Sequence, residues 1–108
     1  MNEELDRWAD PPMLVLTSLA EGPKHGYAII RDIAETVGVT LSAGTLYGVI
    51  ARLEERGYIQ ALPAEDRRRP YRITTAGAQA LAEQSARMRK VADLAARRIA
   101  FNPRTAGA

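Results

Sequence analysis

The sequence predicts a mainly α-helical fold with one small β-hairpin (α+β), and three observations support this prediction. Apolar residues recur at helical spacing over the first half of the chain, the period changes to that of β-strands between positions 58 and 74, and a long helical pattern follows. The 108 residues, 46% of them hydrophobic and 26% charged, are enough for one globular domain with a modest core.

The first two helices are predicted from their end signals. Residues 3–20 are helical in character, and Asp10 before two prolines is a suitable N-cap, so residues 3–9 form a separate short helix or an arm. A second helix is expected from position 25 or 26 to about position 37, with Gly38 closing it. The side chains expected on its apolar side are Tyr27, Ile30, Ile33, Ala34 and Val37.

The third helix is the most clearly bounded, because Ser42 is a favourable N-cap and Gly57 a favourable stop. Its apolar stripe consists of Leu46, Val49, Ile50 and Leu53. The opposite face consists of Gly44, Thr45, Tyr47, Gly48, Ala51, Arg52 and Glu55. These residues are mostly small, polar or cationic, so this face can approach a DNA major groove. The alternative is a solvated face on a packed helix.

A hairpin is predicted after Gly57, because residues 58–62 and 71–74 have strand character and residues 63–70 form a polar loop. Residues 39–41 are a further candidate for a minor strand at the edge of a small sheet. Three helices followed by such a hairpin have the order of a winged helix-turn-helix. The loop carries Arg67, Arg68 and Arg69, which suit contact with DNA phosphates or a narrow minor groove. A solvated basic turn is the alternative.

A long last helix is expected over residues 76–101, capped by Thr75 and ending near Asn102. Its apolar residues recur every three or four positions, so we expect it to bury one side against a second subunit. The alternative is a helix folded back on its own domain. The residues expected at the dimer interface are Trp8, Leu81, Met88, Val91, Ala92, Ala95 and Ile99, with Leu94 as an alternative to Ala95.

Charge is distributed unevenly along the chain, although the net charge is only +2. Up to Asp66, five Lys and Arg residues face eleven Asp and Glu residues, whereas from Arg67 onward ten face two. An anionic partner is therefore expected to meet the second half of the chain. The second hypothesis is a winged helix that docks a protein partner and binds no operator.

Enzymatic and metal-binding functions have little support in the sequence. There is no cysteine, His25 is the only histidine, and neither a phosphate-binding loop nor a dinucleotide fingerprint is present. We therefore expect no enzyme, no cofactor and no metal. The acidic start and the lack of a long apolar run predict a cytoplasmic protein that does not enter the membrane.

The turn before the second helix is a candidate phosphate contact. Exposed N–H groups at a helix N-terminus with Lys24 beside them can bind a phosphate, and the Tyr27 hydroxyl can either donate to one or pack inward. We expect His25 to cap or orient this turn and not to bind metal.

Four stretches together resemble the PadR family of bacterial transcriptional regulators. They are Gly22–Tyr27, Leu41–Tyr47, Arg52–Gly57 and Arg67–Thr74 followed by Gly77. The resemblance covers roughly residues 13–82. It implies a dimeric winged helix that represses promoters at palindromic operators and that small molecules release in many members. Many members have proline where this chain has Gly48, and the single helix after Thr75 resembles the compact subgroup.

By this resemblance the recognition helix corresponds to Ser42–Arg56, the wing to Pro63–Pro70 and the dimerisation helix to the segment after Thr75. We expect an arm and DNA-binding domain (1–74), a dimerisation helix (75–102) and a disordered tail (103–108). The expected function is a homodimeric repressor that binds a double-stranded DNA operator. The residues expected to contact DNA are Lys24, His25, Tyr27, Ser42, Gly44, Thr45, Tyr47, Arg52, Arg67, Arg68 and Arg69.

Overall fold

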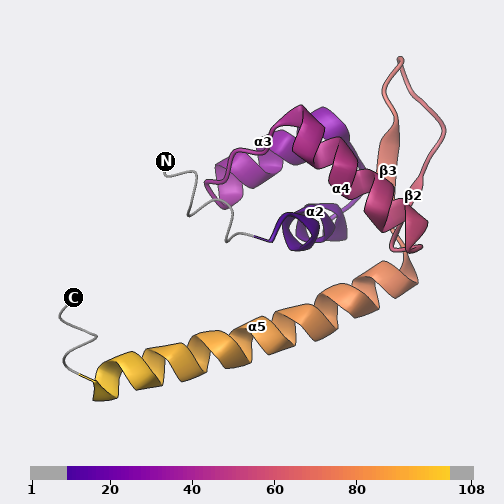
Figure 1. Cartoon of the computed structure of the whole chain (residues 1–108). Helices are drawn as coiled ribbons and strands as arrows, with labels where there is room; N and C mark the ends of the chain where they lie inside the picture. Colours follow the sequence, from indigo (N-terminus) through magenta and orange to yellow (C-terminus); the bar gives the residue numbers. More distant parts are fainter. Residues whose placement is uncertain (1–9, 103–108) are drawn as a thin grey trace.

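The structure is a computed structural model that describes residues 10–102. Its elements are α2 (Pro11–Ala20), β1 (Lys24–His25), α3 (Gly26–Thr36), α4 (Ala43–Glu55), β2 (Ile59–Ala61), β3 (Pro70–Ile73) and α5 (Thr75–Phe101). Figure 1 shows α2, α3 and α4 packed together, the β2–β3 hairpin rising at one end of them, and α5 running away beneath them. The predicted winged helix fold is confirmed. Trp8, the arm and the tail lie outside the described residues.

Polar side chains cap the starts of three helices. The Asp10 carboxylate accepts a hydrogen bond from the Met13 N–H at 3.3 Å, and the Ser42 hydroxyl accepts one from the Thr45 N–H at 3.1 Å, as predicted. The predicted cap of α5 was wrong by one residue. Thr74, and not Thr75, is the cap, because its hydroxyl accepts from the Gly77 N–H while donating to the Gly57 carbonyl at 2.7 Å.

The end of α4 confirms the role predicted for Gly57. This residue has φ +76°, a left-handed conformation that glycine adopts without strain. The Tyr58 N–H bonds the Leu53 carbonyl and the Gly57 N–H bonds the Glu54 carbonyl, both at 2.9 Å. This is a Schellman closure, and it turns the chain from α4 directly into β2. Gly38, with φ +78°, ends the turn after α3 in the predicted way.

The core lies between α2, α3 and α4, and the whole predicted apolar stripe of α4 is buried in it. The predicted apolar side of α3 was partly wrong, because Tyr27, Ala34 and Val37 are exposed. The buried face of α3 instead consists of Gly26, Ile29 and Ile33. Gly26 has no side chain, and Leu46 and Tyr47 of α4 approach it closely.

The sheet has three antiparallel strands in the order β1–β3–β2. In the hairpin Ile59 pairs with Ile73 and Ala61 with Tyr71, while on the other side of β3 His25 pairs with Pro70. The expectation of a minor strand at residues 39–41 was wrong. Val39 and Leu41 place their side chains in the core, and the edge beside β3 is occupied by β1.

The long helix α5 packs on its own domain at its start and is exposed over the rest of its length. Its first turns pack on α2, and Ala80, Leu81 and Gln84 are partly buried there. From Ala86 to Asn102 every residue is exposed, so the rest of the helix projects beyond the domain (Figure 1). The molecule is therefore elongated, measuring 55 × 29 × 20 Å along its principal axes.

Two helical glycines provide a matched test of this packing. A Cβ at Gly77 would clash with the Tyr58 carbonyl oxygen, whereas a Cβ at Gly48 has no neighbour within 4 Å. We expect Gly48→Ala to raise the free energy of unfolding by about 0.5–1 kcal/mol, the usual gain of alanine over glycine in a helix. Gly77→Ala should lower it by about 2 kcal/mol or more. Urea unfolding of both variants measures this, and effects of the same sign would contradict the packing.

Candidate nucleic-acid interface

The exposed face of α4 has the composition that the sequence predicted. Ser42, Thr45, Tyr47, Arg52 and the two glycines between positions 43 and 49 are all exposed. The Ser42 hydroxyl also contacts the Thr45 hydroxyl at 3.0 Å, so both hydroxyls belong to the cap of the helix. This face therefore carries mostly small side chains, with the Tyr47 ring near its start and the Arg52 guanidinium further along.

Tyr47 joins this face to the start of α3. Its hydroxyl lies 2.5 Å from the position that a Cβ would take on Gly26, so only glycine leaves room for the ring there. The side chain of Tyr47 is still half exposed, at 51%. A tyrosine that is supported on one side and open on the other can present its hydroxyl in a fixed position.

A hollow of about 470 Å³ brings the beginning of α3, the beginning of α4 and the hairpin together. Its lining residues are His25, Gly26, Tyr27, Tyr47, Arg67, Arg68, Arg69 and Tyr71. Six of these were predicted to contact DNA, although they are separated by up to 44 positions in the sequence. The fold thus gathers most of the aromatic and cationic candidates around one depression.

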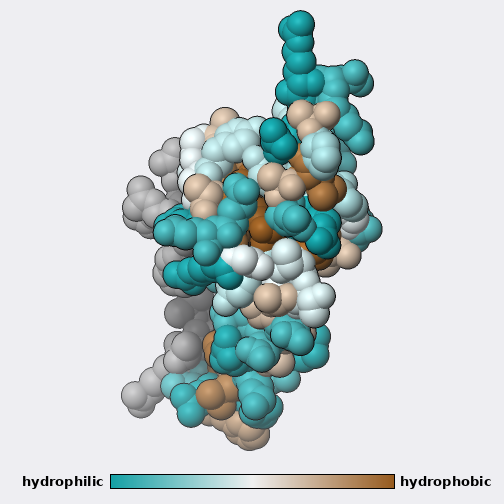
Figure 2. All heavy atoms as spheres, turned by 90° about the vertical axis from the view of Figure 1, so that its right-hand side faces the viewer, coloured by the Kyte–Doolittle hydropathy of each residue, from teal (hydrophilic) through white to brown (hydrophobic). Residues whose placement is uncertain are grey.

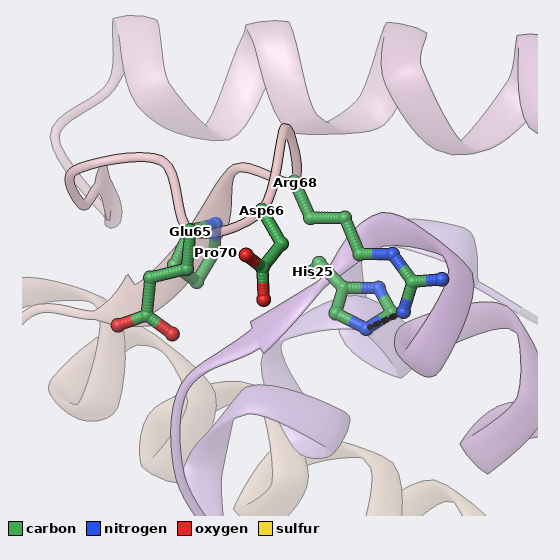
Figure 3. Close-up of a pocket in the computed structure, with 5 residues that line it drawn as sticks. All are labelled: His25, Glu65, Asp66, Arg68 and Pro70. Carbon is green, nitrogen blue, oxygen red and sulfur yellow. Dashed lines mark hydrogen bonds between the residues drawn. The ribbon is translucent and has the colours of Figure 1, made fainter.

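His25 caps α3, as expected. Its Nδ1 atom accepts a hydrogen bond from the Ala28 N–H at 3.3 Å. Its Nε2 atom faces the hairpin and lies 3.3 Å from an Nη atom of Arg68 (Figure 3). The ring therefore connects the start of α3 to the basic loop.

Lys24 does not occupy the place we expected. Its side chain is only 15% exposed, its ammonium donates to the Ser18 carbonyl, and it forms ion pairs with Glu21 at 2.7 Å and Asp32 at 3.7 Å. These contacts balance the charge of Lys24 within the fold and fix the turn after α2, and a phosphate contact of Lys24 stays a prediction.

The three arginines of the loop have different surroundings. Arg69 donates to the Leu62 carbonyl at 2.8 Å and so braces the base of the hairpin, while Arg68 lies against His25. Asp66 and Arg67 form the tip with φ of +49° and +67°, the left-handed pair that a tight two-residue hairpin turn requires. Figure 2 shows this hairpin as a hydrophilic projection standing above the body of the molecule.

Tyr27 is 62% exposed, and the guanidinium of Arg31 lies 6.0 Å from the centre of its ring. The side chain is therefore accessible to a bound anion. The packed alternative that the sequence left open does not apply to this side chain.

Sequence reasoning missed Gly26 and Tyr71. Burial raises the pKa of the Tyr71 phenol, the Glu54 carboxylate and Tyr47 raise it further, and Arg69 lowers it. The alternation of β3 places Tyr71 on the face opposite the exposed Arg72, which could have indicated that its ring turns toward α4. The glycine directly before Tyr27 gave no comparable signal, because its role depends on the approach of a distant helix.

The candidate dimer residues are distributed over two environments. Leu81 packs partly against the core of its own domain. The large side chains of Met88, Val91, Leu94 and Ile99 are exposed, and so are Ala92 and Ala95. An exposed apolar row of this length on a single helix calls for a partner surface.

Two further observations concern residues 10–102 alone. None of the helices there is long and apolar enough to cross a membrane. In the same part of the chain no group of three or more His, Asp and Glu side chains is placed to hold a metal ion.

Comparisons with known proteins agree on one family. The sequence profile of the transcriptional regulator PadR-like family matches residues 15–83. A PadR family transcriptional regulator from Eggerthella lenta has a similar structure, with 32% identity, a TM-score of 0.79 and coverage of 92% of this chain and 88% of that one. A transcriptional regulator from Clostridium thermocellum has 29% identity and a TM-score of 0.74, with coverage of 80% and 89%.

A curated relative, an uncharacterized 37.1 kDa protein in a transposon of Streptomyces fradiae, is 41% identical over 85 residues. The match covers 79% of this chain but only 25% of that protein, so the chain spans about a quarter of the length of this relative.

The raised pKa of Tyr71 predicts a dependence of stability on pH. Because the phenol ionises above pH 10.0 in the folded chain, the unfolded chain loses this proton first. The contribution to stability is therefore present below that pH and is lost as the pH rises past it. In urea unfolding, the free energy of unfolding should fall less between about pH 9 and about pH 10.5 in Tyr71→Phe than in the unchanged protein. An equal fall in both would contradict the assignment.

Proposed function

The chain belongs to the PadR-like family of transcriptional regulators, which makes it a DNA-binding regulator, and we propose that it acts as a homodimeric repressor at a palindromic operator. One observation supports this proposal above the others. The start of α3, the exposed face of α4 and the hairpin meet around one depression that carries arginines and tyrosines. Protein–DNA contacts are made largely by such side chains.

In this proposal α4 enters the major groove with its exposed face of small and polar side chains toward the bases. Thr45, Tyr47 and Arg52 then contact base edges or phosphates. Gly44 and Gly48 have no side chain, and even a Cβ at either position would have no neighbour within 4 Å, which favours close approach of the helix backbone to DNA. Tyr27 is placed beside this face and is proposed to donate its hydroxyl to a phosphate.

The hairpin is the wing in this proposal. Arg67 and Arg68 reach the flanking backbone or the minor groove, while Arg69 holds the base of the wing through the Leu62 carbonyl. The tight turn at Asp66 and Arg67 supports a wing of defined shape, because both residues are fixed in a conformation that few non-glycine residues adopt.

We propose dimerisation through α5. Leu81, Met88, Ala92, Ala95 and Ile99 follow one another at intervals of seven, four, three and four residues, and Ser85 fills the longest interval. This is the spacing of a coiled-coil seam. Two subunits related by a two-fold axis would then present two recognition helices to half-sites about one helical turn of DNA apart, or a multiple of it. The division at residue 75 into a DNA-binding domain and a dimerisation helix is part of this proposal.

The cytoplasmic location and the absence of enzymatic activity, both predicted from the sequence, belong to this proposal. So does release from DNA by a small-molecule effector, which the family resemblance implies. Docking of a protein partner without any operator is the other candidate, and the excess of acidic residues before Arg67 is the feature that favours it. Duplex DNA binding at physiological salt separates the two.

The wing predicts a change in salt dependence. In Arg67→Ala/Arg68→Ala, binding to every duplex should weaken, and the slope of log K against log salt should flatten by about four, because each of the two subunits loses two phosphate contacts and about one counterion is released for each contact. Fluorescence anisotropy over a salt series measures the slope. Arg97→Ala/Arg98→Ala is the control, since it removes the same charge from α5, and a loss of slope there instead would remove the wing from the interface.

The proposed dimer seam has a matched control on the same helix. Met88 and Leu94 are 44% and 39% exposed, but Leu94 lies off the seam, about 120° around the helix. We expect Met88→Lys to shift the protein toward monomer in sedimentation equilibrium, because each dimer would place two ammonium groups in the seam. Leu94→Lys should leave the dimer intact. Dissociation by Leu94→Lys alone would place the interface on another face.

A further inference from the structure

Two hydrogen-bond donors face each other where the wing meets α3. Because His25 Nδ1 accepts from the Ala28 N–H, the proton of the neutral ring must be on Nε2. Arg68 carries only donors, and its Nη atom lies 3.3 Å from this Nε2 atom. The contact is therefore donor to donor, and the two groups lack a shared acceptor.

The surrounding side chains supply no such acceptor. The hollow beside this contact has a volume of about 470 Å³ and is lined by Glu65, Asp66 and Pro70 in addition to His25 and Arg68 (Figure 3). Among the described residues neither carboxylate forms an ion pair with Arg68 or His25. Arg69, the neighbouring arginine, is already bonded to the Leu62 carbonyl.

We propose that His25 Nε2–H and the Arg68 guanidinium together bind one non-bridging oxygen of a DNA backbone phosphate. Two donors 3.3 Å apart can both reach a single oxygen at about 2.8 Å from each, which is the usual length of a charge-assisted hydrogen bond. This inference rests on the proposed DNA-binding function and specifies one of its contacts. The two donors come from different elements, β1 and the wing.

A phosphate held by His25 and Arg68 would also affect the position of the wing. His25 pairs with Pro70 across the β1–β3 ladder and caps α3 through the other ring nitrogen. A phosphate bound between His25 and Arg68 would therefore fix the wing relative to the start of α3, beside Tyr47 and the recognition helix. Binding of the phosphate would therefore be coupled to the positioning of the wing.

One substitution at position 25 can remove the Nε2–H donor and still keep the N-cap of α3. His25→Asn keeps a side-chain oxygen at the N-cap, where asparagine is among the best residues, but has no group that reaches Arg68. His25→Ala loses the cap as well. Urea unfolding should show that the asparagine variant is about as stable as the unchanged protein and that the alanine variant is less stable, which separates folding effects from binding effects.

The test is a double-mutant cycle on DNA affinity. The probe is a duplex selected from a random-sequence library with the full-length protein, and binding is followed by fluorescence anisotropy. We expect His25→Asn to weaken binding by about a hundredfold, because each of the two subunits loses one hydrogen bond to a charged group, worth about tenfold. In an Arg68→Gln background the same change should cost less than about twofold, because both side chains bind the same phosphate. In an Arg67→Gln background it should again cost about a hundredfold.

A second experiment locates the phosphate. Single backbone phosphates of the selected duplex are replaced in turn by neutral methylphosphonates. One position should weaken binding by the unchanged protein yet have little effect on the His25→Asn/Arg68→Gln variant. Costs of His25→Asn that are equal in the Arg68→Gln and Arg67→Gln backgrounds would overturn the shared contact, even though DNA binding itself persists. If no duplex is selected at all, the DNA-binding function fails, and this contact fails with it.

Discussion

The arrangement of the whole chain depends on two consecutive peptide units at Gly57 and Tyr58. The Gly57 carbonyl accepts from the Thr74 hydroxyl at 2.7 Å, and the Tyr58 carbonyl accepts from the Thr74 N–H at 3.0 Å. Gly77 packs directly onto the same Tyr58 carbonyl. The end of α4, both strands of the hairpin and the start of α5 are thus joined within a few ångströms. Position 57 favours glycine because its φ is +76°, and position 77 requires glycine because a Cβ there would clash with the Tyr58 carbonyl. Position 74 requires a hydroxyl for its bonds to the Gly57 carbonyl and the Gly77 N–H.

This junction sets the relative positions of the hairpin, α4 and α3. The Schellman closure sets the direction in which the hairpin leaves α4, and β3 in turn pairs with β1, whose last residue caps α3. Hydrogen bonds therefore link α4 to the wing, the wing to β1 and β1 to α3. A rigid frame of this kind lowers the entropic cost of presenting several side chains to one ligand. It also explains why arginines and tyrosines far apart in sequence surround one hollow.

Local signals in the sequence predicted most of the fold, and long-range contacts account for the errors. Asp10, Ser42 and Gly57 act on backbone groups within a few residues, so their roles could be inferred from the sequence alone. The buried face of α3 could not, because it depends on how closely Tyr47 of another helix approaches Gly26. The partners of Lys24, by comparison, lie within eight residues of it, and the sequence analysis did not consider these ion pairs. Tyr71 escaped notice because strand pairing places it in the hollow.

The proposed dimer along α5 would account both for the exposed half of that helix and for the small number of free arginines at the interface. In the described residues, Arg52, Arg67 and Arg68 are the arginines of the interface whose guanidiniums have no carbonyl or carboxylate partner. Three phosphate contacts give weak binding at physiological salt, since each one releases about one counterion. In the proposed dimer, pairing two subunits along α5 would double the number of contacts and bury Met88 and Ile99 at the same time. Burial of the apolar row would then be coupled to DNA affinity.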